Sequence, residues 1–147
     1  MKKKNGPIKV GMMLLNAGRG SGVVARQQAR SLQDRGHGVV FIHPGVGDGV
    51  EGAINVDVSL PGSTTPVHEY LPSAGDAQQA LSTMEHNHSL EFVPYYEIAL
   101  EQHIGDLDVV IGHHGNLVAL AVSNVCRRAY KTFALFLHGT GVEPRLH

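Results

Sequence analysis

Residues 8–22 read IKVGMMLLNAGRGSG, an apolar run that passes directly into a glycine-rich segment. A nearly continuous apolar run of this length is typical of a parallel strand with both faces buried. The glycines after Leu15 are typical of a tight turn into a helix, and Ser21 or a neighbouring residue can cap that helix. The segment therefore predicts a buried strand over residues 8–15 that leads into a helix.

The residues after this turn complete a strand-helix-strand unit. A narrow apolar stripe at helical spacing predicts a helix that ends at Gly36. The stripe consists of Val24, Ala25, Ala29 and Leu32. Residues 39–42 then form a second buried strand, which ends at His43. A connection of this kind between parallel strands is almost always right-handed.

The same alternation returns near the end of the chain. Apolar stretches predict a strand over residues 108–111, a helix over 117–126 and a last strand over 132–137. The middle of the chain, residues 44–106, is less regular. It is predicted to contain strands over 54–58 and 67–71 and helices over 78–84 and 93–103.

This order of elements predicts one α/β domain over residues 1–147. The expected architecture is Rossmann-like: an open, mostly parallel sheet with helices on both faces. Too few strands are predicted to close a barrel. In open sheets of this kind ligands bind beyond the carboxyl ends of the strands, so functional residues are sought there.

The composition excludes several classes of function. Twelve basic residues against thirteen acidic ones leave a formal net charge of −1, so we expect no nucleic-acid partner. No stretch approaches the roughly 18–20 apolar residues of a transmembrane helix, although peripheral membrane contact stays open. The single cysteine, Cys126, is expected to be a buried apolar residue of a cytoplasmic protein.

Glycines and histidines follow four of the predicted strands. They are Gly18, Gly20 and Gly22 after the first strand, His43 after the second, and His113, His114 and His138 after the last two. Because the carboxyl ends of parallel strands meet at one edge of a sheet, we expect these residues along a single rim.

Gly20, Ser21 and Gly22 are candidates for binding a phosphate. Glycine lets the backbone approach an anion closely, and the free N–H groups of a helix start point towards it. The spacing is Gly-x-Gly-x-Gly, which differs from both the dinucleotide fingerprint and the P-loop. A plain tight turn between strand and helix is the alternative interpretation.

Metal binding and covalent catalysis are the other chemistries that the sequence raises. His113, His114 and His138 could ligate a metal in a hydrolase, but no zinc-binding spacing supports this, and we expect no metal or cofactor. Ser21 lacks the nucleophile-elbow motif, and Cys126 lies within a predicted helix.

Three segments together resemble a known family. They are the glycine segment followed by residues 33–45 (QDRGHGVVFIHPG), residues 106–114 (DLDVVIGHH) and residues 136–141 (FLHGTG). In order and spacing they are similar to the first Rossmann-like domain of the retaining glycosyltransferases of family four, also called group one, which have the GT-B fold.

The resemblance implies roles for particular residues. Gly20, Ser21 and Gly22 would face the diphosphate of a nucleoside diphosphate sugar, and His138 would approach the donor sugar. His113 and His114 would line the cleft. His68 and Glu69, within the irregular middle segment, would contact the acceptor.

The second domain of that family, which binds most of the nucleotide and carries a Glu-x7-Glu signature, has no counterpart in this chain. We therefore expect the N-terminal half of a retaining hexosyltransferase, inactive by itself, with weak self-association through its uncovered cleft wall. The alternatives are a stand-alone nucleotide-binding or flavodoxin-like module and the metal-dependent hydrolase.

Overall fold

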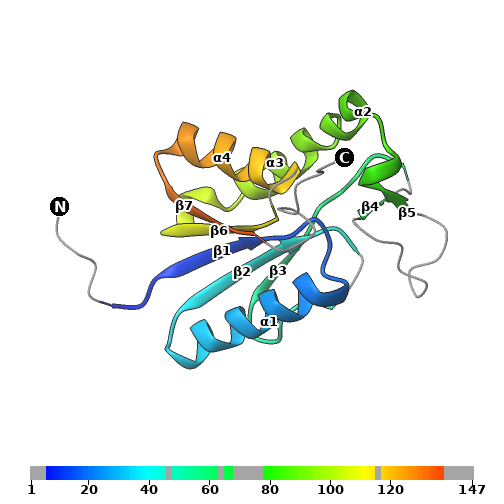
Figure 1. Ribbon diagram of the computed structural model, residues 1–147. Coiled ribbons are helices and arrows are strands. Elements are labelled where there is room, and N and C mark those ends of the chain that lie inside the picture. Colours follow the sequence, from blue (N-terminus) through cyan, green and yellow to red (C-terminus); the bar gives the residue numbers. More distant parts are fainter. Residues whose placement is uncertain (1–5, 46–47, 63–64, 68–77, 115–116, 138–147) are drawn as a thin grey trace.

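The computed structural model describes residues 6–45, 48–62, 65–67, 78–114 and 117–137 (Figure 1). The elements in chain order are β1 (Lys9–Met13), α1 (Arg19–Asp34), β2 (Gly38–His43), β3 (Ile54–Asp57), β4 (Thr65–Val67), β5 (Gln78–Ala80), η2 (Leu81–Thr83), α2 (His86–Leu90), α3 (Val93–Glu101), η3 (Ile104–Asp106), β6 (Val109–His113), α4 (Leu117–Ala129) and β7 (Thr132–Phe136).

The main sheet has five parallel strands in the order β3-β2-β1-β6-β7. Counted along the chain within this sheet, the order is 3-2-1-4-5. This is the dinucleotide-binding Rossmann order, whereas flavodoxin-like sheets have the order 2-1-3-4-5. The predicted fold, an open parallel Rossmann-like sheet with helices on both faces, is confirmed.

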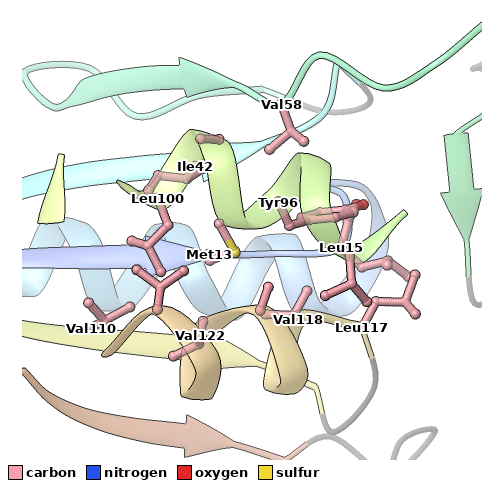
Figure 2. Packing of buried hydrophobic residues seen from close by; sticks show 14 of the residues in the cluster. Met13, Leu15, Ile42, Val58, Tyr96, Leu100, Val110, Leu117, Val118 and Val122 are labelled. Carbon is pink, nitrogen blue, oxygen red and sulfur yellow. The ribbon is translucent and has the colours of Figure 1, made fainter. Parts of the chain in front are cut away.

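Helices cover the two faces of the sheet and bury two apolar clusters. α1 lies on one face, and α3 and α4 lie together on the other (Figure 1). Alternate residues of β1 and of the segment directly after it face the two sides of the sheet: Met12 and Leu14 belong to the cluster on the α1 face, while Met13 and Leu15 pack with α3 and α4. Figure 2 shows the second cluster around Met13 and Tyr96. The near-continuous apolar run of β1 is therefore explained by burial on both sides.

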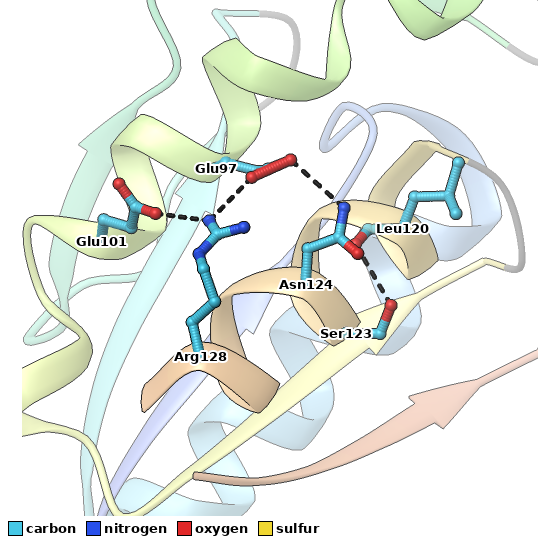
Figure 3. A network of polar contacts seen from close by, with 6 residues as sticks. All are labelled: Glu97, Glu101, Leu120, Ser123, Asn124 and Arg128. Atoms are coloured by element: carbon cyan, nitrogen blue, oxygen red, sulfur yellow. Dashed lines mark hydrogen bonds and ion pairs between the residues drawn. The ribbon is translucent and has the colours of Figure 1, made fainter. Parts of the chain in front are cut away.

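A polar network joins α3 to α4 on the solvent side of the second layer (Figure 3). Arg128 of α4 donates hydrogen bonds to Glu97 and Glu101 of α3, at 2.8 Å to Glu97. Asn124 donates to the same Glu97 carboxylate at 3.3 Å. The network holds the last turns of the two helices against each other.

Most of the predicted elements are confirmed, and three differ. The helix predicted over residues 78–84 is wrong, because Gln78–Ala80 instead pairs with β4 as a parallel strand and a short 3₁₀ turn follows. The strand predicted over 67–71 lies at Thr65–Val67, and residues 68–71 lie outside the described part of the chain. α1 begins at Arg19, so Ser21 lies within its first turn rather than at its cap.

Among the described residues, no helix combines the length and the apolar character that crossing a membrane requires.

Candidate functional site

The strand order changes direction at the carboxyl edge of the sheet between β1 and β6, which makes this position a topological switch point. The chain continues from β1 towards β2 and β3 on one side, and β6 and β7 lie on the other. Open α/β sheets bind ligands at such a topological switch point. We call the carboxyl ends of β1, β2 and β6, together with the start of α1, the switch-point site.

The loop from β1 to α1 is held in place by contacts from distant segments. The Asn16 side chain is buried and accepts a hydrogen bond from the backbone N–H of Gly18 at 3.1 Å. Its amide nitrogen donates to the Pro66 carbonyl at 3.4 Å. The Tyr96 hydroxyl, from α3, donates to the Leu15 carbonyl at 2.8 Å. This loop is therefore preorganised without a ligand.

The start of α1 is open to an anion. Its N-cap is Gly18, no described side chain caps it, and its first turn contains no acidic residue. Apart from its chain neighbours and the nearby backbone of α1 itself, no described atom lies within 4 Å of the position that a Cβ on Gly20 would take. Uncapped N–H groups at a helix start attract negative charge because they add to the helix dipole.

Gly20 and Gly22 are glycines for different physical reasons. A Cβ on Gly22 would lie 1.9 Å from the carbonyl oxygen of Ala17, so this glycine allows the helix to pack against the loop before it. The same carbonyl accepts a hydrogen bond from Arg26 Nη1 at 2.7 Å. Gly22 is thus a packing requirement, whereas Gly20 faces open space. Both glycines were predicted to bind phosphate, whereas the glycine pattern carries no signal for the structural roles of Asn16 and Arg26.

His43 and His113 lie on the two sides of β1 and on the same face of the sheet. Met13 pairs with Ile42 on one side and with Gly112 on the other. The next residue of each strand, His43 or His113, therefore lies beside Leu14. By strand alternation they share the α1 face with Leu14. Since α1 returns antiparallel to the strands, its N-terminus is at this edge too. Two imidazoles and a helix start therefore lie at the same edge and on the same face of the sheet.

Burial favours the neutral form of His43. Burial lowers the pKa of its imidazole, and this effect exceeds the opposing influences of the Pro44 carbonyl and the Asp57 carboxylate. The Pro44 carbonyl oxygen lies 2.7 Å from Nδ1 and can only accept, so Nδ1 carries the proton. The other ring nitrogen, Nε2, is then an acceptor. His43 can receive a hydrogen bond here but adds no positive charge.

His113 and His114 are both enclosed. They are 0% and 3% exposed, and the His113 ring lies against Phe136 with a centroid distance of 5.4 Å. His114 has a φ of 75°, in the left-handed region, which costs a residue with a Cβ about 1–2 kcal/mol. Its N–H donates to the Phe136 carbonyl. Strained backbone of this kind occurs frequently at functional sites.

The remaining predicted site residues cannot be placed. His138, His68 and Glu69 lie outside the described residues, and their predicted roles stay predictions. Within the described ranges, no group of three or more His, Cys, Asp or Glu side chains is arranged to hold a metal ion.

Comparison with known proteins supports the fold. No protein-family model matches this chain, and no curated protein matches it. A similar solved structure is the C-terminal domain of a hydrogenase from Pyrococcus furiosus, with 11% identity and a TM-score of 0.50. The match covers 89% of this chain and 92% of that one. At this identity the likeness concerns the α/β architecture alone.

Proposed function

We propose that this chain is the first Rossmann-like domain of a retaining GT-B glycosyltransferase and that it contacts the diphosphate of a nucleoside diphosphate sugar at the start of α1. One observation carries the proposal: an uncapped helix start with open space at Gly20 lies at a topological switch point. The three sequence segments that resemble the family narrow the ligand class to sugar nucleotides.

Electrostatics favour an anionic ligand at this position. The first-turn N–H groups of α1 and the helix dipole both stabilise negative charge. In glycosyl transfer, negative charge grows on the departing diphosphate, and fixed N–H donors stabilise it without reorganising. His43 offers a neutral acceptor at the same edge, suited to a hydroxyl or an N–H of the ligand.

The other residues take roles that follow from their placement or from the resemblance. His113 and His114, being enclosed, shape the floor of the site. Ser21 in the first turn of α1 is a further hydrogen-bond donor for the diphosphate. By resemblance, His138 contacts the donor sugar and His68 with Glu69 contacts the acceptor. Catalysis in this scheme requires a second domain that binds the nucleotide.

The binding step is tested by amide NMR with inorganic pyrophosphate and then with UDP-, GDP- and ADP-glucose. We expect saturable shifts in the amides of residues 18–22 that Gly20→Ala weakens about tenfold, roughly 1.4 kcal/mol. Gly20→Ala should stabilise the fold by about 0.5–1 kcal/mol, because alanine is the better helix former, so a loss of binding cannot come from unfolding.

Gly105→Ala is the matched control. Gly105 also has open space around its Cβ position, but it lies before β6, at the opposite edge of the sheet. It should leave binding unchanged. If the amides of residues 18–22 do not respond to any of these anions, the proposed site is wrong.

The transfer step needs a separate measurement. In a chain that carries a second Rossmann-like domain after residue 147, His138→Ala should lower hexose transfer while pyrophosphate shifts in residues 18–22 persist. Anion binding without any sugar transfer would favour the stand-alone nucleotide-binding module, for which the 3-2-1-4-5 strand order is equally suited.

A further inference from the structure

A concave surface lies on the outer side of α4, between that helix, β7 and the segment that contains η2 and α2. We call it the α4 groove. Its volume is about 560 Å³, which falls within the range of roughly 300–1,000 Å³ that is typical of small-molecule sites. β7 is the last strand on its side of the described sheet, which explains why this face is incompletely covered.

The walls of the α4 groove are mainly apolar. Leu120 of α4 and Leu135 of β7 line it and are 42% and 38% exposed. Phe133, two residues before Leu135, lines the same face of β7, as strand alternation requires. Leu81 and Met84 close the opposite side. Large apolar side chains left open to water favour an apolar ligand.

The hydroxyl groups in the groove are already engaged. Ser89 donates to the His86 carbonyl at 2.7 Å, and Ser123 donates to the Leu120 carbonyl at 3.2 Å. Because both hydroxyl protons bond to carbonyls of their own helices, these two serines offer a ligand no free hydroxyl proton in the middle of the groove.

Among the described residues that line the groove, the permanent positive charge is that of Arg127, at one end, and His86 is the other titratable side chain. Leu120, Ser123 and Arg127 share one face of α4, and Leu117 and Arg127 are separated by about 15 Å at 1.5 Å per residue. Arg127 makes no ion pair with any described residue, whereas its neighbour Arg128 is paired with two carboxylates. The described residues that line the groove include no Asp or Glu.

We propose that the α4 groove binds the hydrocarbon chain of a single anionic amphiphile, with the head group held at Arg127. The α4 groove is long and apolar, and it ends at the Arg127 guanidinium, which has no ion pair with a described residue. These features fit one hydrocarbon chain that carries one anionic head group. A bilayer surface is instead recognised by clusters of about 4–8 basic residues. This site is separate from the switch-point site, and the proposal does not depend on glycosyl transfer.

The test is calorimetry with dodecyl phosphate below its critical micelle concentration, alongside dodecyltrimethylammonium and inorganic phosphate. We expect saturable binding of dodecyl phosphate near 1:1, weaker binding of the cation with the same chain, and none of inorganic phosphate at this site. Methyl NMR should place the shifts at Leu120 and Leu135. Equal affinity for the two charged amphiphiles would overturn the role of Arg127.

Variants separate the two halves of the proposal. Arg127→Gln should weaken dodecyl phosphate binding about fivefold, as expected for a partly exposed charge pair. Arg128→Gln, the matched loss of charge one residue away, should leave the affinity unchanged. Ser123→Phe should fill the groove and abolish binding, with circular dichroism verifying that the fold is retained.

Three results would overturn the proposal. They are an absence of dodecyl phosphate binding, binding to anionic vesicles without binding to the monomeric amphiphile, and a concentration-dependent dimer that protects Leu120 and Leu135. The first removes the site, the second assigns the surface to a membrane, and the third assigns it to another copy of this chain.

Discussion

At the residue scale, the switch-point site shows how burial sets the chemistry of a side chain. His43 is the last residue of the buried strand β2, and desolvation lowers the pKa of its imidazole although the Pro44 carbonyl and Asp57 favour the charged form. In the proposed function, attraction of the diphosphate is therefore assigned to the N–H groups at the start of α1 and not to His43. His43 thus contributes an acceptor rather than a cation.

The lowered pKa of His43 predicts a pH dependence of stability. The unfolded chain takes up a proton near pH 6.5, while the folded protein resists it. The contribution of His43 to the free energy of unfolding is therefore fully present above pH 6.5, and it is lost as the pH falls towards the pKa of the folded state. In urea unfolding between pH 8 and pH 5, the free energy of unfolding should fall less with decreasing pH for His43→Gln than for the unchanged protein. Parallel curves would contradict the assignment.

At the element scale, α1 and α4 end in the same way with different residues. In α1 the N–H of Gly36 donates to Gln33 and that of His37 donates to Leu32. In α4 the corresponding donors are Tyr130 and Lys131, which bond to Arg127 and Cys126. Both are Schellman motifs, which favour glycine at the left-handed position. α1 has Gly36 there at φ 87°, and α4 has Tyr130 at φ 55°.

This comparison predicts that Tyr130→Gly stabilises the protein by about 0.5–1 kcal/mol, because a left-handed residue with a Cβ is strained. The tyrosine side chain is 96% exposed, so little packing is lost. Urea denaturation measures the change. Tyr130→Ala retains a Cβ and should gain nothing. An equal gain in Tyr130→Ala would mean that the side chain, not the backbone, is responsible.

At the scale of the whole molecule, the sheet separates two apolar layers that are built from the same strands. Tyr96 of α3 reaches the Leu15 carbonyl at the end of β1, so the layer with α3 and α4 also supports the switch-point loop. Damage to that layer should therefore reach the proposed anion site even though α1 lies on the other face.

Cys126 reports on the integrity of this layer. Its side chain is fully buried in α4, and burial raises the pKa of its thiol to about 11. Since the thiolate is the reactive form, the folded protein should react with Ellman's reagent at pH 8 at least about a hundredfold more slowly than the urea-unfolded chain. The rate should rise with urea along the unfolding curve. Rapid reaction in plain buffer would show that α4 opens locally.

The strands and helices that were predicted correctly are those whose signal lies in neighbouring residues of the sequence. The apolar runs of β1 and β2, the stripe of α1 and its stop at Gly36 each depend on neighbouring residues. The rim of residues at the strand ends follows from the same pattern, because parallel strands place their carboxyl ends together. The strand at Gln78–Ala80 was missed because its partner, β4, supplies the reason for it to be extended.

The amino-acid sequence alone determined the alternation of strands and helices and with it the Rossmann-like class, because hydrophobic period and glycine turns are short-range properties. The tertiary structure decided which candidate residues are open, enclosed or structural. Gly22 meets the Ala17 carbonyl, His113 is sealed beneath the surface, and Asn16 bonds to Pro66 across 50 positions of chain. Such contacts depend on how distant segments pack, which local patterns do not encode.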